Sequence, residues 1–111
     1  MIEVSELDFE KEVLGCKLPV FACFTAKWCH TCFPTCLVAD QLIKEYDGRV
    51  KFVMINIDAA ESKAMTDTYS VIVVPTILLF QDAQPVKKLV GFQDRSSLRR
   101  LLDRVIEEDY S

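Results

Sequence analysis

The chain has 111 residues, of which 50% are hydrophobic and 27% are charged, and its formal net charge is −4 at pH 7. This length is typical of one folded unit, so we expect a single domain over 1–111. The acidic balance, with Lys and Arg dispersed along the chain, argues against nucleic-acid binding and against an anionic membrane surface. No apolar run approaches the roughly 20 residues of a bilayer span, and the first residues lack a secretory signal pattern. We therefore expect a cytoplasmic protein.

The first predicted elements are a helix and a buried strand. Ser5 is a favourable N-cap and Gly15 a typical stop, so we predict a helix over 5–15. The run 18–25 is almost continuously apolar and rich in β-formers, which is typical of a strand buried on both faces. The apolar face of the predicted helix is formed by Leu7, Phe9, Val13 and Leu14.

The middle of the chain predicts a second helix, a second strand and a third helix. Helix formers run from 29 to 46, with Pro34 early in the helix and Asp47-Gly48 as its stop. A second buried strand is predicted over 50–57 and a helix over 60–69. The apolar residues at helical spacing in 29–46 are Leu37, Val38, Leu42 and Ile43.

The last part of the chain predicts a hairpin and a final helix. Two β-prone runs, 76–80 and 85–90, are separated by a connection short enough for an antiparallel hairpin, which Gly91 closes. An amphipathic helix follows over about 98–107, with Leu98, Leu101, Leu102, Val105 and Ile106 on one face. The element order predicts an α/β fold, with a mixed central sheet flanked by helices on both faces.

The run Trp28-Cys29-His30-Thr31-Cys32 carries the clearest chemistry. The 5 cysteines of the chain lack the regular spacing of a disulfide-rich secreted domain, so redox chemistry or metal binding is expected. The run stands where a buried strand leads into a helix, whose N-terminus favours a thiolate. A gap of two residues brings the sulfurs within bonding range, so Cys29 can attack a disulfide and Cys32 can release the product.

The sequence resembles the thioredoxin family over nearly its whole length. The resemblance implies the thioredoxin fold and a protein-disulfide oxidoreductase that works through Cys29 and Cys32 without a bound cofactor. It is carried by Trp-Cys-X-X-Cys at 28–32, Asn56-Ile57-Asp58, Val74-Pro75-Thr76, Leu78-Leu79-Phe80 and Gly91.

The same resemblance implies how substrates bind. In the family, the proline that matches Pro75 has a cis peptide bond and faces the disulfide, and the residue that matches Val74 offers its backbone to the substrate. We therefore assign substrate binding to Trp28, Val74, Pro75 and Gly91; a trans proline that merely starts a strand is the alternative. Disulfide-containing proteins are the implied substrates and a thioredoxin reductase-type flavoprotein the electron donor. We also expect a monomer.

The dipeptide His30-Thr31 departs from the Gly-Pro that most thioredoxins have between the cysteines. Loss of the stiff proline, and gain of an imidazole that favours the Cys29 thiolate when protonated, predict a more oxidising pair. We therefore assign His30 and Thr31 to tuning of the redox potential. The alternative is an exposed His30 with little influence.

Two buried charges of typical thioredoxins are also replaced. Aligning the motifs places Cys23 where the family has an aspartate on the central strand, and Met54 where it has a lysine on the neighbouring strand. Losing both together avoids leaving one buried charge unpaired. Cys23 is then a small buried hydrophobe. Cys32 is left to lose its proton to water or to His30, and we expect slower release of the partner.

Cys36 is the least ordinary feature. It follows Cys32 by four residues, so Cys29, Cys32 and Cys36 are predicted to share a helical face. A Cys32–Cys36 disulfide would be strained, which favours a core or partly buried thiol at Cys36. A redox-sensing thiol and a metal ligand are the alternatives. Cys16 gives no functional signal.

Two other functions stay open at this point. In the first, the thiolates of Cys29, Cys32 and Cys36 hold zinc or an iron–sulfur cluster together with His30, although structural zinc sites usually draw ligands from two separate segments. A non-catalytic module could use the groove beside the motif tryptophan and the predicted cis proline as a peptide dock, although the presence of both motif cysteines argues against it.

Overall fold

A computed structural model describes residues 1–59 and 62–107. Its centre is a five-stranded sheet in the order β1-β3-β2-β4-β5. Strands β1, β3 and β2 are parallel, β4 is antiparallel to β2, and β5 is antiparallel to β4. The sheet is therefore mixed, as predicted. Its strands are Ile2–Glu3 (β1), Val20–Thr25 (β2), Lys51–Asn56 (β3), Thr76–Gln81 (β4) and Gln84–Val90 (β5).

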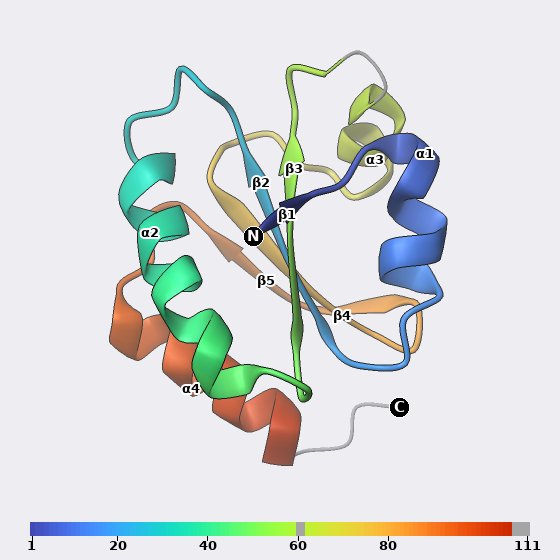
Figure 1. Cartoon of the computed structure of the whole chain (residues 1–111). Coiled ribbons are helices and arrows are strands. Elements are labelled where there is room, and N and C mark those ends of the chain that lie inside the picture. Colours follow the sequence, from blue (N-terminus) through green and yellow to red (C-terminus); the bar gives the residue numbers. More distant parts are fainter. Residues whose placement is uncertain (60–61, 108–111) are drawn as a thin grey trace.

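Helices cover both faces of this sheet. Figure 1 shows α2 and α4 on one side and α1 and α3 on the other. The predicted α/β architecture is thus confirmed. Among the described residues, no helix is long and apolar enough to cross a bilayer. The helices are Glu6–Phe9 (α1), which continues as a π-helix over Glu10–Leu14, Cys32–Leu42 (α2), which continues as a 3-10 helix over Ile43–Tyr46, Lys63–Thr68 (α3) and Arg95–Glu107 (α4).

Strand β2 divides the core into two clusters, because successive side chains of a strand point to opposite faces. Phe21 and Cys23 belong to the cluster that includes residues of α2 and α4, whereas Ala22 and Phe24 belong to the cluster that includes residues of α1 and α3. Every residue of β2 is buried. The prediction of a central strand buried on both faces is therefore confirmed.

Several predicted boundaries differ from the structure. Strand β2 begins at Val20, two residues after the predicted start, and Leu18 is 37% exposed. Helix α2 begins at Cys32 and not at Cys29, so Pro34 lies in its first turn, where the missing N–H interrupts no helical hydrogen bond. Of the helix predicted over 60–69, residues 60 and 61 lie outside the described residues. The short strand β1 was not predicted.

Two residues assigned to apolar helix faces are exposed. Leu7 is 88% and Leu37 is 48% exposed. In α2 the buried face is instead formed by Cys32, Thr35, Ala39 and Leu42. Leu37 fits the helical spacing, but the contact with the sheet is centred on other positions of the helix.

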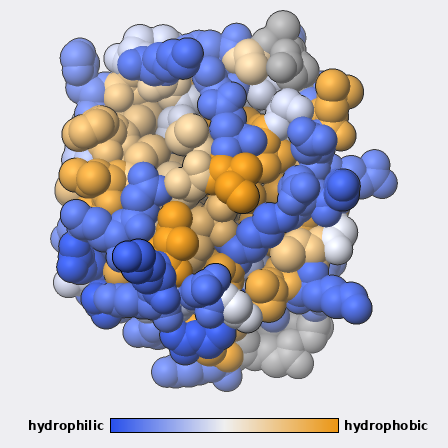
Figure 2. Space-filling view, in the orientation of Figure 1, coloured by the Kyte–Doolittle hydropathy of each residue, from blue (hydrophilic) through white to orange (hydrophobic). Residues whose placement is uncertain are grey.

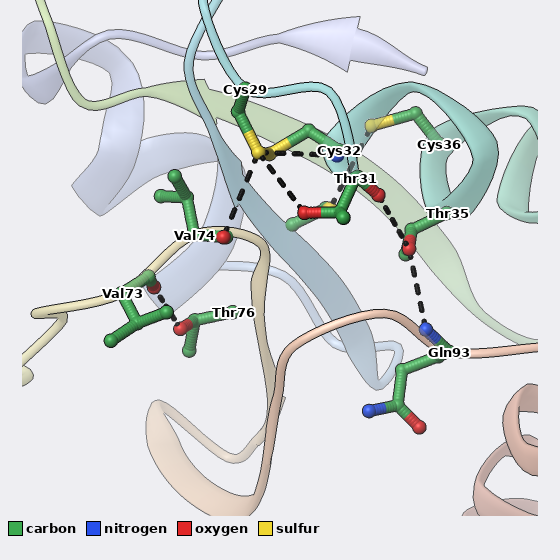
Figure 3. Close-up of a disulfide and its surroundings, with 10 residues drawn as sticks. Cys29, Thr31, Cys32, Thr35, Cys36, Val73, Val74, Thr76 and Gln93 are labelled. Carbon is green, nitrogen blue, oxygen red and sulfur yellow. Dashed lines mark hydrogen bonds between the residues drawn. A yellow bond between two sulfur atoms is a disulfide. The ribbon is translucent and has the colours of Figure 1, made fainter.

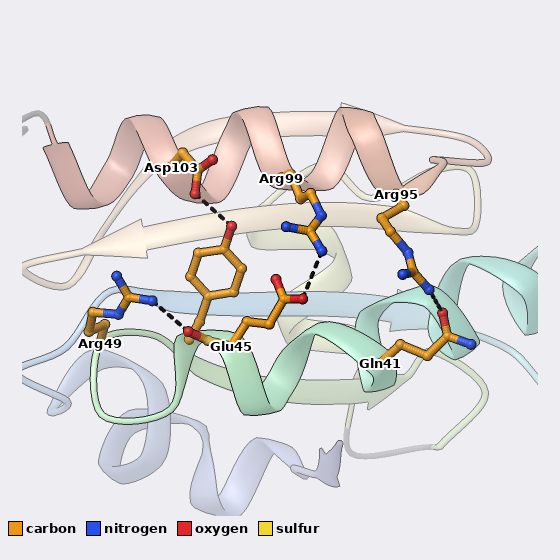
Figure 4. A network of polar contacts seen from close by, with 7 residues as sticks. Gln41, Glu45, Arg49, Arg95, Arg99 and Asp103 are labelled. Carbon is orange, nitrogen blue, oxygen red and sulfur yellow. Dashed lines mark hydrogen bonds and ion pairs between the residues drawn. The ribbon is translucent and has the colours of Figure 1, made fainter.

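Polar contacts join the 3-10 helix that continues α2 to α4 (Figure 4). The Tyr46 hydroxyl donates a hydrogen bond to Asp103 Oδ1 at 2.6 Å, and Arg99 forms an ion pair with Glu45 at 2.7 Å. Burial of the ring and the hydrogen bond to the Asp103 carboxylate raise the pKa of Tyr46 to about 12. These contacts fix the helix that begins at Cys32 against α4.

Candidate functional site

Cys29 and Cys32 form a disulfide where the loop after β2 leads into α2. Their Cα atoms are 5.3 Å apart. Cys32 is the first residue of the helix, and its backbone N–H donates a hydrogen bond to Cys29 Sγ at 3.1 Å. Cys29 thus lies outside the helix but receives one of the N–H groups that the first turn of a helix leaves unpaired.

The two cysteines differ in their access to solvent. Cys32 is 3% exposed, whereas Cys29 is partly exposed. A protein substrate can therefore reach the sulfur of Cys29 but not that of Cys32. This asymmetry distinguishes an attacking sulfur from a sulfur that can act only within the molecule.

The loop before β4 faces the disulfide. The Val74–Pro75 peptide bond is cis, as expected, and the Val74 carbonyl oxygen lies 3.6 Å from Cys29 Sγ. Figure 3 shows this carbonyl turned toward the sulfur. Pro75 is buried and accepts a hydrogen bond from the Gly91 N–H at 2.8 Å. Gly91 has φ +87°, a conformation that favours glycine, so it holds the end of β5 beside the loop.

Thr35 and Gln93 belong to the site, and the sequence analysis missed both. Thr35, fully buried at the end of the first turn of α2, donates to the Thr31 carbonyl at 3.2 Å and accepts from the Gln93 N–H at 3.3 Å (Figure 3). The Gln93 side chain donates to the Gly91 carbonyl at 3.3 Å. These bonds tie the motif to the segment after β5. A threonine among the apolar positions of α2 was the available signal.

Exposed apolar side chains adjoin the site residues in sequence. They are 52% to 72% exposed, which is high for side chains of this size. Each lies next to Cys29, Cys32, Val74 or Gly91 along the chain. We call this set the apolar rim, and it consists of Trp28, Phe33, Val73 and Phe92.

The residues between the cysteines both face solvent. His30 and Thr31 are exposed, and Thr31 Oγ1 lies 3.5 Å from Cys29 Sγ. The structure therefore places the Thr31 hydroxyl beside the Cys29 sulfur. The sequence analysis did not predict this contact. His30 follows Cys29 in the chain, and its side chain is exposed.

Cys23 and Met54 occupy the places expected from the motif alignment. They are register partners across the β2–β3 pair, and Cys23 is fully buried. The core behind the disulfide is thus neutral at both positions. The expectation of a small buried cysteine is confirmed.

Cys36 is placed differently from the prediction. Because α2 begins at Cys32, Cys29 does not share a helical face with Cys36. All three cysteines instead line one pocket of about 250 Å³. Cys36 Sγ lies 3.9 Å from Cys23 Sγ. In 1–59 and 62–107, no three His, Cys, Asp or Glu side chains are grouped as a metal site would require.

Hydrophobic surface continues beyond the disulfide. Figure 2 shows hydrophobic side chains that gather on the viewed face, from the region over α2 toward the middle of the molecule, with hydrophilic surface around them. The pocket at the three cysteines includes Phe33 and Met54 in its lining. The disulfide therefore lies at the border between a hydrophobic surface and solvent.

A disulfide between a reachable and a buried cysteine, at the start of a helix and opposite a cis proline, defines the site of a thiol–disulfide oxidoreductase. The thioredoxin family model matches residues 1–104. Thioredoxin 1 of Synechococcus elongatus is 33% identical over 101 residues, which cover 91% of this chain and 92% of that protein. The thioredoxin of Staphylococcus epidermidis is 32% identical over 105 residues, covering 94% and 96%. The chain belongs to the thioredoxin family.

Proposed function

We propose that the protein reduces or exchanges disulfides of other proteins, with Cys29 as the attacking thiolate and Cys32 as the resolving thiol. The observation that supports these roles is the difference in exposure between the two sulfurs. The hydrogen bond from the Cys32 N–H to Cys29 Sγ stabilises negative charge on the attacking sulfur once the pair is reduced.

The reaction follows the usual course of thiol–disulfide exchange. The Cys29 thiolate attacks one sulfur of the substrate disulfide, forms a mixed disulfide and releases the other substrate sulfur as a thiolate. Cys32 then loses its proton and attacks Cys29 Sγ, which releases the second substrate sulfur. The substrate gains two electrons and two protons, and Cys29 and Cys32 are left as the disulfide that the structure contains.

The proton of Cys32 needs a path that does not use a buried carboxylate, because Cys23 stands at that position. The pocket of about 250 Å³ reaches Cys32 from the surface and also has Lys27 and Asn56 in its lining. Its size admits water, so solvent can take the proton there. This path supports resolution by Cys32 without the family's aspartate.

Substrate binding is assigned to the surface around Cys29. An extended substrate chain would lie along the Val74 backbone, between Trp28 and the segment that starts at Gly91, with Pro75 shaping the loop. The exposed apolar rim supports this placement, since burying it against a partner is favourable. Tuning of the potential is assigned to His30 and Thr31, and Thr31 Oγ1 beside Cys29 supports the second assignment.

The cellular setting completes the proposal. Membership of the family implies disulfide substrates and a reductase as electron donor. We assign the donor to the thioredoxin reductase type, and we take the protein to act in the cytoplasm as a monomer that consists of one domain over 1–111. The acidic net charge of −4 and the dispersed basic residues support a role without nucleic acid.

Reduction of insulin by dithiothreitol tests the proposed roles. The wild-type protein should accelerate the reaction, and Cys29→Ser should abolish the acceleration. Cys32→Ser, reduced and then freed of dithiothreitol before insulin is added, should accumulate a mixed disulfide with insulin because the resolving thiol is missing. Cys16→Ser is the matched control and should behave as wild type. Trapping by Cys29→Ser, or full activity of that variant, would contradict the assignment. The reduction potential of the Cys29–Cys32 pair, measured against glutathione, then shows whether the protein acts as a reductant or as an oxidant.

A further inference from the structure

A second pair of sulfurs lies behind the active-site disulfide. Cys23 on β2 and Cys36 on α2 have their Sγ atoms 3.9 Å apart, and both cysteines are free thiols. A disulfide requires the sulfurs to approach to about 2 Å, so the remaining gap is within the range of a side-chain rotation. Neither residue has a role in the exchange reaction proposed above.

The two thiols differ in their access to small molecules. Cys23 is fully buried, whereas Cys36 is partly buried and lines the pocket of about 250 Å³ beside Cys32. A pocket of this size holds several water molecules and therefore admits a small oxidant, but no folded protein. Oxidation from outside must begin at Cys36.

The pKa shifts of the two thiols also favour a reaction that begins at Cys36. The contact between the two sulfurs, 3.9 Å apart, lowers the pKa of Cys36. The same contact and burial raise the pKa of Cys23 well above its usual value. Of the two thiols, Cys36, which lines the pocket, is therefore the one that loses its proton first, while the buried Cys23 keeps its proton. This is the division that an attacking thiolate and a resolving thiol require.

We propose that Cys23 and Cys36 form a second redox dithiol, which a small hydroperoxide entering the pocket at Cys36 oxidises to a disulfide. The Cys36 thiolate attacks the peroxide oxygen and breaks the O–O bond, which yields a sulfenic acid and a hydroxide or alkoxide. The Cys23 sulfur then attacks Cys36 Sγ, and water leaves with the Cys23 proton. The two sulfurs lose two electrons, and the peroxide gains them.

The product would link the central strand to the helix of the active site. Cys23 lies in the middle of β2, and Cys36 lies one turn after Cys32 on α2. The new bond would hold that turn of the helix against the sheet. The inference does not depend on the proposed exchange reaction, because it uses neither Cys29 nor Cys32.

The test uses the wild-type protein with Cys29 and Cys32 already disulfide-bonded, so that Cys16, Cys23 and Cys36 are the free thiols. One equivalent of hydrogen peroxide should lower the thiol count of the denatured protein from three to one and the mass by about 2 Da. Trypsin cleaves after Lys17, Lys27 and Lys44, so the new bond should join peptide 18–27 to peptide 28–44. Cys36 should react at least about tenfold faster than Cys16.

Three variants make the outcome specific. Cys36→Ala should retain its two remaining free thiols and form no link, whereas Cys16→Ala should form the link as wild type does. With two equivalents of hydrogen peroxide, Cys23→Ala, if it folds, should carry Cys36 as a sulfinic acid, because the resolving thiol is absent and the sulfenic acid is oxidised a second time. A link that persists in Cys36→Ala would show exchange with the active-site pair and overturn the proposal. Loss of Cys16 as fast as Cys36, or sulfinic acid without a link in wild type, would overturn it as well.

Discussion

The backbone N–H of Cys32 donates a hydrogen bond to the sulfur of Cys29 at 3.1 Å. This bond comes from the first residue of α2, where N–H groups have no partner within the helix. The sulfur of the more exposed cysteine, Cys29, is thus the one that accepts this hydrogen bond. The helix stabilises charge at the position where a substrate can reach it.

Alkylation of the reduced protein checks this relationship. Because a hydrogen bond from the helix N-terminus favours the thiolate, Cys29 should react with iodoacetamide at pH 7 about tenfold faster than Cys16. The rates are measured by mass spectrometry of tryptic peptides, with fragment spectra that locate the label among the cysteines of peptide 28–44. Equal rates for Cys29 and Cys16 would show that the bond does not activate the sulfur.

Removal of one ring from the apolar rim should weaken protein substrates selectively. Phe92 is 53% exposed beside Gly91, and losing its contact with a partner should cost about 1 kcal/mol. In Phe92→Ser, kcat/KM for insulin should fall about fivefold, while the rate with a small disulfide stays unchanged. Leu7→Ser, at a position 88% exposed on α1, is the matched control. A parallel fall with both substrates would indicate a damaged disulfide site and not a binding surface.

The bond between Tyr46 and Asp103 should contribute to stability. Tyr46→Phe removes a hydrogen bond to a carboxylate and should lower the free energy of unfolding by about 1 kcal/mol, measured by urea denaturation at pH 7. Tyr69→Phe is the control, because the Tyr69 hydroxyl makes no hydrogen bond within the described part of the chain. A loss in Tyr69→Phe as large as that in Tyr46→Phe would assign the effect to the hydroxyl group in general.

The same tyrosine predicts a loss of stability at high pH. The pKa of Tyr46 is about 12 in the folded protein and 10.0 at its usual value, so the folded state disfavours the ionised ring. This contribution is complete below pH 10 and is lost as the pH rises through about 12. The stability advantage of wild type over Tyr46→Phe should therefore shrink between pH 10 and pH 12 in urea titrations. An advantage that stays constant over this range would contradict the assigned shift.

Gly91 should resist replacement by residues with a side chain. Its φ of +87° is strained for other residues, and an added Cβ would meet no described atom within 4 Å, so the cost is one of backbone conformation. Gly91→Ala should lose about 1–2 kcal/mol of unfolding free energy, read from urea denaturation. Gly91→Asn should lose less, because asparagine tolerates this conformation better. Equal losses in the two variants would point to a cause other than φ.

Much of the fold could be predicted from sequence, since its main elements have strong local signals. The apolar run of β2 has no polar alternation, which only a strand covered on both faces permits. The spacing of Cys29 and Cys32 placed the disulfide at the start of a helix, and the resemblance to the thioredoxin family implied the cis bond at Pro75. Local signals failed at boundaries, as at the start of α2, because the residues before a helix resemble those inside it.

The contact between Cys23 and Cys36 could not be predicted, because it joins a strand to a helix across 13 positions. Sequence periodicity tells which face of each element is apolar, but not which residues of two elements meet. Cys23 shares its strand face with Phe21, which packs in the cluster with α2. The alternation of side chains along a strand predicts this shared face, but it does not predict the residue of α2 that Cys23 contacts. The bonds of Thr35 to Thr31 and Gln93 depend on tertiary placement in the same way.

The two outer strands of the sheet limit how one molecule can meet another. Strand β1 has only two residues, and β5 carries Pro85, Lys87 and Lys88, which discourage pairing along an open edge. Neither flank presents a long flat row of free amide and carbonyl groups, so growth of the sheet from chain to chain is disfavoured.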